Sequence, residues 1–157
     1  MRLEYFDLID RILEIDIENR KICAEGIVPI ESPVFGGHFP GFPLMPGVML
    51  LETMAQAAGW LVIGITEFTR MPFLAAVKEA KLRSFVTPGT TLNVEAVIVH
   101  EGSGFAVTTA RVRIESKLVC NCEITFRLVP FPNPQLRAAM LQRAVAIAFP
   151  METVADV

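Results

Sequence analysis

Residues 37–66 read GHFPGFPLMPG-VMLLETMAQAAGWLVIGIT, a proline-rich loop that runs directly into a long apolar segment. Proline fixes its own φ and restricts the residue before it, so the loop is predicted to be stiff. The segment that follows is apolar all round, which is typical of a helix buried on every side. We therefore expect one long central helix, from about Gly47 to Thr66, with the remaining chain built around it.

The same stretch holds the candidate catalytic residues. His38 is one of two histidines, and Glu52 follows it by 14 residues inside the apolar helix. An imidazole and a carboxyl group in apolar surroundings suit proton transfer. Gly47 opens the helix, where free backbone N–H groups can hold a carbonyl oxygen that gains negative charge. Gln56 follows Glu52 by one turn and can orient it, or it can be a core amide satisfied by the backbone.

Strand-like runs flank the helix on both sides. They cover residues 12–17, 22–30, 73–86, 92–100, 105–116 and 118–129, and turn residues join most of them as consecutive hairpins. We expect an α+β fold in which an antiparallel β-sheet wraps around the long central α-helix. The sheet is too small to cover that helix completely, which predicts a partner subunit. Residues 4–10 are expected to form a short helical turn, and residues 31–47 a loop.

Helical spacing returns near the end of the chain. Residues 135–149 place Leu136, Met140 and Ala144 on one face, with Arg137 and Arg143 elsewhere. We divide the chain into a domain at residues 1–130 and a partly helical tail at residues 131–157.

Composition and charge exclude several classes of protein. The net charge is −3 and no basic stripe with interleaved aromatic residues is present, which argues against nucleic-acid binding. The apolar helix approaches transmembrane length, but Glu52 and Gln56 would lie in mid-bilayer, so no membrane span is expected. The three cysteines follow no metal spacing and the two histidines lie far apart, so no metal site is expected. We expect a reducing, cytoplasmic location.

A longer pattern points to a family. The sequence HFPGFPLMPGV at residues 38–48, ETMAQA at 52–57, and FLAAVKEAKLR at 73–83 with VTPG at 86–89 resembles the β-hydroxyacyl-acyl carrier protein dehydratases of fatty-acid synthesis. Glutamate at position 52 resembles the FabZ branch rather than the aspartate-bearing FabA branch. The resemblance covers roughly residues 5–128 and implies the hotdog fold, with a homodimer or a trimer of dimers as the assembly.

The resemblance also implies roles for the candidate residues. His38 would remove the α-proton of a 3-hydroxyacyl thioester, and Glu52 of the neighbouring chain would protonate the departing hydroxyl group. The Gly47 amide would bind the thioester carbonyl oxygen, and Gln56 would steady Glu52. The products would be a trans-2-enoyl thioester and water, and no metal or organic cofactor is needed.

The partner implied by the resemblance is an acyl carrier protein that bears the 3-hydroxyacyl phosphopantetheine thioester. Carrier proteins are acidic, and Lys78, Lys81 and Arg83 form a local basic cluster that would dock one. The alternative is that these residues form a solvated strand face. The tail after Pro130 is longer than in the common form and is similar to that of dehydratases in very-long-chain acyl synthesis, which suggests a long substrate.

Two other functions are compatible with such a fold. One is a hotdog thioesterase, which would hydrolyse the thioester. The other is a non-catalytic module that binds acyl thioesters. The presence of both His38 and Glu52 favours the dehydratase, because a binding module does not need this pair.

Overall fold

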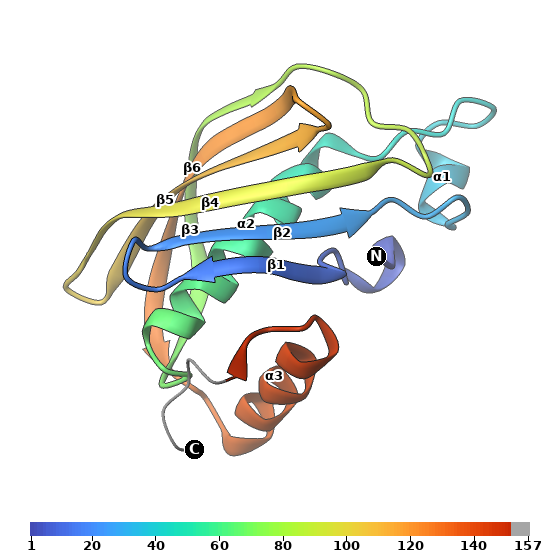
Figure 1. The fold of residues 1–157 in the computed structure, drawn as a ribbon. Helices are drawn as coiled ribbons and strands as arrows, with labels where there is room; N and C mark the ends of the chain where they lie inside the picture. The colour runs from blue at the N-terminus through green and yellow to red at the C-terminus, as the bar shows by residue number, and fades with distance from the viewer. Residues whose placement is uncertain (152–157) are drawn as a thin grey trace.

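The computed structural model describes residues 1–151, in which a curved sheet surrounds one long helix (Figure 1). The elements in chain order are η1 (Leu3–Tyr5), β1 (Arg11–Asp16), β2 (Lys21–Ile27), α1 (Val34–Gly37), α2 (Gly47–Ile65), β3 (Arg70–Leu82), β4 (Thr91–Gly102), β5 (Phe105–Ile114), β6 (Lys117–Pro130) and α3 (Pro134–Ala146). The predicted division at residue 130 remains a prediction. The end of the predicted tail, residues 152–157, lies outside the described residues.

All strand pairs of the sheet are antiparallel, and the strand order is β1-β2-β4-β5-β6-β3. Strands β1 and β2, β4 and β5, and β5 and β6 are hairpins, as the turn residues predict. Strand β3 is the exception, because it pairs with the last strand and lies at an edge of the sheet. Among residues 1–151, no strand pairs with its other edge.

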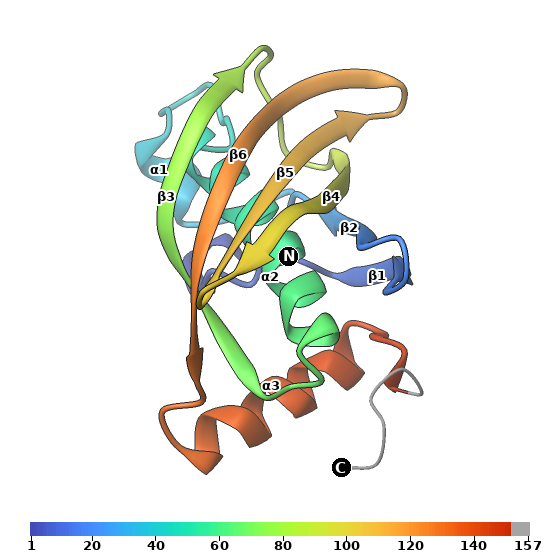
Figure 2. The ribbon, with the colours of Figure 1, turned by 90° about the vertical axis from the view of Figure 1, so that its left-hand side faces the viewer.

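Helix α2 forms the core. The sheet curves around it (Figure 2), and Met54, Ala57 and Leu61 are completely buried. Gly47–Ile65 has the length and composition of a membrane span, but 72% of the most apolar window is buried inside the protein. A helix that is already covered by its own sheet is accounted for as a core helix. The expected architecture, a sheet wrapped around a central helix, is confirmed.

Several boundaries differ from the sequence predictions. The loop at residues 31–47 contains the one-turn helix α1, and the helical turn expected at residues 4–10 is the shorter η1. Strand β2 ends at Ile27, two residues before Pro29, which lacks the N–H that a central strand needs. Strand β3 begins at Arg70 and ends at Leu82, so it lies earlier in the sequence than the predicted run at 73–86.

Helix α3 lies across the C-terminal end of α2 (Figures 1 and 2). Asn133 caps it by accepting a hydrogen bond from the Leu136 N–H at 2.7 Å. After the helix, the Ile147 carbonyl oxygen accepts from the Ile12 N–H of β1 at 2.7 Å, and Phe149 packs edge-on against Phe68. The described part of the tail is therefore bound to the sheet and to α2.

Candidate active site

The loop itself holds His38 in place. The His38 N–H donates to the Val34 carbonyl oxygen of α1 at 3.1 Å, and the Leu44 N–H donates to the His38 carbonyl oxygen at 3.0 Å. The imidazole Nδ1 lies 3.1 Å from the Leu44 carbonyl oxygen. Because a carbonyl oxygen can only accept, Nδ1 carries the hydrogen and Nε2 keeps its lone pair. The predicted base thus has one nitrogen ready to accept a proton.

Gly47 lies beside His38. Both residues line an open pocket of about 480 Å³ that the end of β3 completes through Leu82. Gly47 is the first residue of α2, where backbone N–H groups have no partner within the helix. A Cβ atom at this position would come within 2.6 Å of the Leu82 Cδ1 atom, so glycine lets the strand approach the helix end. The geometry brings the predicted oxyanion donor and the predicted base into one pocket.

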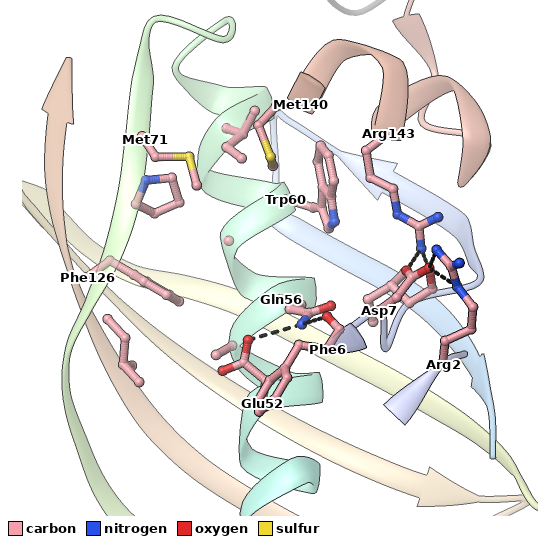
Figure 3. A pocket seen from close by; sticks show the side chains of 16 residues that line it. Arg2, Phe6, Asp7, Glu52, Gln56, Trp60, Met71, Phe126, Met140 and Arg143 are labelled. Carbon is pink, nitrogen blue, oxygen red and sulfur yellow. Dashed lines mark hydrogen bonds and ion pairs between the residues drawn. The ribbon is translucent and has the colours of Figure 1, made fainter. Parts of the chain in front are cut away.

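Gln56 holds Glu52 one turn away on α2. The Gln56 Nε2 group donates to the Glu52 Oε1 atom at 3.0 Å and to the Phe6 carbonyl oxygen at 2.7 Å. Its Oε1 atom accepts from the Leu8 N–H at 3.2 Å. The sequence left open whether Gln56 orients Glu52 or is satisfied by the backbone, and the structure shows both contacts. The carboxylate is therefore tied to the segment before β1 (Figure 3).

Asp7, between the two backbone partners of Gln56, is held by two arginines. The Arg2 side chain donates two hydrogen bonds to its Oδ2 atom, and Arg143 of α3 binds its Oδ1 atom. Arg143 also donates to the Ile9 carbonyl oxygen at 2.6 Å. The segment that positions Gln56 is thus anchored to α3.

Glu52 and Gln56 line a second pocket of about 450 Å³. The pocket extends along α2 past Trp60, between the first residues of β3 and α3 (Figure 3). Its further walls are largely apolar and include Ile63, Met71 and Met140. An apolar pocket with a carboxyl group at one end is suited to a ligand with an apolar chain and a polar head.

The predicted site residues therefore fall into two pairs. His38 and Gly47 share one pocket, Glu52 and Gln56 share another, and among the described residues neither pocket is lined by both His38 and Glu52. The two pockets reach β3 at opposite ends, the Glu52 pocket through Met71 and the His38 pocket through Leu82. Within the described residues of a single chain, the predicted base and the predicted acid thus line different pockets.

The three basic residues are exposed on β3 and just after it. Lys78 and Lys81 lie on the strand, and Arg83 lines the mouth of the His38 pocket. Arg83 donates to the Lys81 carbonyl oxygen and to the Asn121 Oδ1 atom. One member of the cluster, Arg83, is thus placed at the pocket that holds the predicted base.

Sequence reasoning missed the residues that α3 contributes. Met140 and Arg143 both line the Glu52 pocket, whereas the sequence set the arginine apart from the apolar face. The available signal was the presence of Arg137 and Arg143 away from the apolar face, but nothing in it identified Asp7 as the partner of Arg143, 136 residues away. Arg137 is engaged as well, because its Nε group donates to the Phe68 carbonyl oxygen at 3.0 Å.

The cysteines are all free thiols. Cys120 and Cys122 are buried on the inner face of β6, and burial raises the pKa of Cys120 to about 11 and that of Cys122 to about 12. Across residues 1–151, no group of three or more His, Cys, Asp or Glu side chains is placed to hold a metal ion.

Comparison with protein-family models matches residues 2–123 to the FabA-like domain. The chain belongs to this family. Curated FabA-like relatives named 3-hydroxyacyl-[acyl-carrier-protein] dehydratase FabZ agree with it over most of its length. The protein of Chlamydia pneumoniae is 41% identical over 79% of this chain and 83% of its own. The protein of Symbiobacterium thermophilum is 36% identical over 83% of this chain and 92% of its own.

Solved structures confirm the fold of this FabA-like chain. A mutant of a thioesterase from Staphylococcus aureus matches with a TM-score of 0.62 at 14% identity, over 82% of this chain and 98% of that one. A thioesterase from Haemophilus influenzae matches with a TM-score of 0.59 at 14% identity, over 78% of this chain and 80% of that one. At such identities the match concerns the fold alone, which is the α+β hotdog fold that the sequence predicts.

Proposed function

We propose that this chain is a 3-hydroxyacyl-acyl carrier protein dehydratase of fatty-acid biosynthesis, which forms trans-2-enoyl-acyl carrier protein and water. The relatives above carry this name at identities of 36% and 41% over most of the chain. The structural observation that carries the proposal is His38, whose Nδ1 hydrogen is bound by the Leu44 carbonyl oxygen, which leaves Nε2 able to accept a proton in a pocket that Gly47 also lines.

The reaction requires two proton transfers and a place for negative charge. His38 Nε2 takes the proton from C2 of the substrate, and the electrons of that C–H bond form the C2–C3 double bond. The Gly47 N–H holds the thioester oxygen as it gains negative charge. Glu52 in its acid form gives a proton to the 3-hydroxyl group as the C3–O bond breaks, and water leaves. Proton return from His38 to Glu52 completes the cycle.

The catalytic pair is proposed to form between two chains. Antiparallel pairing of two β3 edges would lay the start of one strand beside the end of the other. The His38 pocket at Leu82 of one chain would then face the Glu52 pocket at Met71 of its partner. The exposed β3 side chains support this edge as an interface, because Leu74 is 52% exposed and Leu82 is 51% exposed. A homodimer, alone or in a trimer of dimers, is the proposed assembly.

The proposed partner is an acyl carrier protein, which the substrate class requires. Lys78, Lys81 and Arg83 remain the proposed docking residues, supported by the position of Arg83 at the mouth of the His38 pocket. A cytoplasmic location remains a proposal too, supported by the three free cysteines.

The test is the ultraviolet absorbance of enoyl thioester formed from a 3-hydroxyacyl carrier protein. His38→Ala and Glu52→Gln are each expected to lower kcat by about 100-fold or more, because each removes one proton transfer. His100→Ala is the matched control, since this exposed histidine of β4 lies outside both pockets. Unchanged rates in both site variants would contradict the mechanism.

The same assay separates the two alternatives. Release of free thiol without enoyl product would identify a thioesterase, and tight binding without any turnover would identify a binding module. No observation on the site favours either, and the structural likeness to thioesterases concerns the fold alone.

A further inference from the structure

The Glu52 pocket runs along one face of α2. Glu52, Gln56, Gly59 and Ile63 follow each other along one face of α2, and all four line the pocket. At a rise of 1.5 Å per residue, Gly59 lies about 10 Å and Ile63 about 16 Å along the helix from Glu52. An acyl chain whose reacting carbons lie at Glu52 would extend along this face, toward the C-terminal end of α2.

The middle of the pocket lies where α2 and β3 approach each other. A Cβ atom at Gly59 would meet the Pro72 Cγ atom at 3.6 Å, which is ordinary van der Waals contact. An alanine therefore fits at this position, but it takes up space that glycine leaves open. Trp60, the single tryptophan of the chain, lines the pocket beside it.

Helix α3 supplies the wall at the far end. The Met140 side chain lies at the end of the pocket away from Glu52 (Figure 3). Arg137 and Arg143, three residues before and after Met140, are fixed to the Phe68 carbonyl oxygen and to Asp7. Because both neighbouring turns are anchored, Met140 is held in place across the pocket end.

We propose that α3 is the end wall of the acyl-binding pocket and that Met140 sets the longest acyl chain that the pocket accepts. This inference rests on the proposed function, because it assigns the apolar pocket to the acyl chain of that substrate. The family match ends at residue 123, so the wall comes from a helix outside the matched domain. A wall at this depth limits the chain length, in contrast to the very long substrate that the long tail suggests.

Chain-length preference tests the wall. The ratio of kcat/KM for long and short 3-hydroxyacyl thioesters is measured for wild type and for Met140→Ala. Removing the side chain is expected to move the optimum to longer chains, with a gain of about fourfold for each methylene that enters the pocket. Gly59→Ala narrows the pocket and is expected to move the optimum to shorter chains.

Leu141→Ala is the matched control. Leu141 is the neighbouring apolar residue of α3, packs against the core and does not line the pocket. This variant reports the loss of stability that shortening an apolar side chain of α3 causes, while the pocket wall stays the same. An equal optimum in wild type, Met140→Ala and Gly59→Ala would overturn the proposal, and so would the same shift in Leu141→Ala.

A binding measurement separates this inference from the proposed function. Quenching of Trp60 fluorescence reports the binding of S-alkyl pantetheine thioethers of increasing length, which the enzyme cannot turn over. A length limit that moves in Met140→Ala supports the wall, whether or not the wild type forms an enoyl product. Absence of an enoyl product would contradict the proposed dehydratase function but not the wall. Binding with no length limit in wild type would overturn the wall, whatever the activity.

Discussion

At the scale of single residues, Gln56 connects the carboxylate of Glu52, the proposed acid, to the segment before β1. Its amide makes three hydrogen bonds, one to Glu52 and two to the backbone of the segment before β1. The two backbone bonds fix the rotamer of Gln56, so its contact with Glu52 does not depend on a free side chain. We therefore propose Gln56 as a positioning residue for the predicted acid.

Gln56→Leu is expected to lower kcat by about tenfold, because Glu52 loses the donor that orients it. The free energy of unfolding is expected to fall by about 1–3 kcal/mol, since the buried Leu8 N–H loses its acceptor. Steady-state kinetics and urea unfolding measure the two effects. Gln142→Leu, at an exposed position of α3, is the control and should leave kcat unchanged. A full rate in Gln56→Leu would contradict the positioning role.

At the scale of elements, the sequence predicted what depends on local pattern. The apolar run from Gly47 identified α2, and the hairpin turns identified most neighbours in the sheet. The position of β3 beside β6 was not predicted, because β4 and β5 separate these two strands along the chain and no hairpin turn joins them. The helical spacing of α3 was readable, but its docking depends on Arg143 meeting Asp7, and periodicity does not identify a partner so distant in sequence.

Strand β6 gives a pH-dependent prediction. The raised pKa values of Cys120 and Cys122 mean that the fold favours the protonated thiols. Their stabilising contribution is complete below the unfolded pKa of about 8.5 and is lost as the pH rises from there toward about 11. The free energy of unfolding in urea is therefore expected to fall over this range, and to fall less in Cys122→Ala.

Iodoacetamide labelling at mildly alkaline pH checks the same two thiols directly. Mass spectrometry is expected to find Cys23, which is half-buried, modified before the two buried cysteines of β6. Labelling in urea, where all three thiols are exposed, is the control. Rapid modification of Cys122 in the folded protein would show that β6 is not packed as described.

At the scale of the whole molecule, the edge strand β3 links the two pockets. Each pocket holds half of the predicted catalytic set, and β3 connects them at its two ends. The sequence could supply the residue types and their spacing, but the 14 residues between His38 and Glu52 do not say whether they meet within one chain. The fold adds that the two residues line different pockets, which β3 connects, and on this we base the proposal that they meet across two chains.

Mixing two inactive variants tests this proposal. A dimer of one His38→Ala chain and one Glu52→Gln chain has one intact site and one doubly altered site. With free exchange of subunits, an equal mixture is expected to recover about a quarter of the wild-type rate. Mixing His38→Ala with His38→Asn is the control and should recover nothing. Failure to recover activity after verified exchange would place both residues in the same chain's site.

The bond between Arg143 and Asp7 has a consequence for the order in which the protein becomes complete. A ribosome releases the chain from its first residue onward, and domains begin to fold as they emerge. Asp7 emerges 136 residues before Arg143, and all six strands and helix α2 lie between the two along the chain. The sheet and the central helix can therefore form before Arg143 is available to bind Asp7, so the proposed end wall is the part of the pocket that is put in place after the rest.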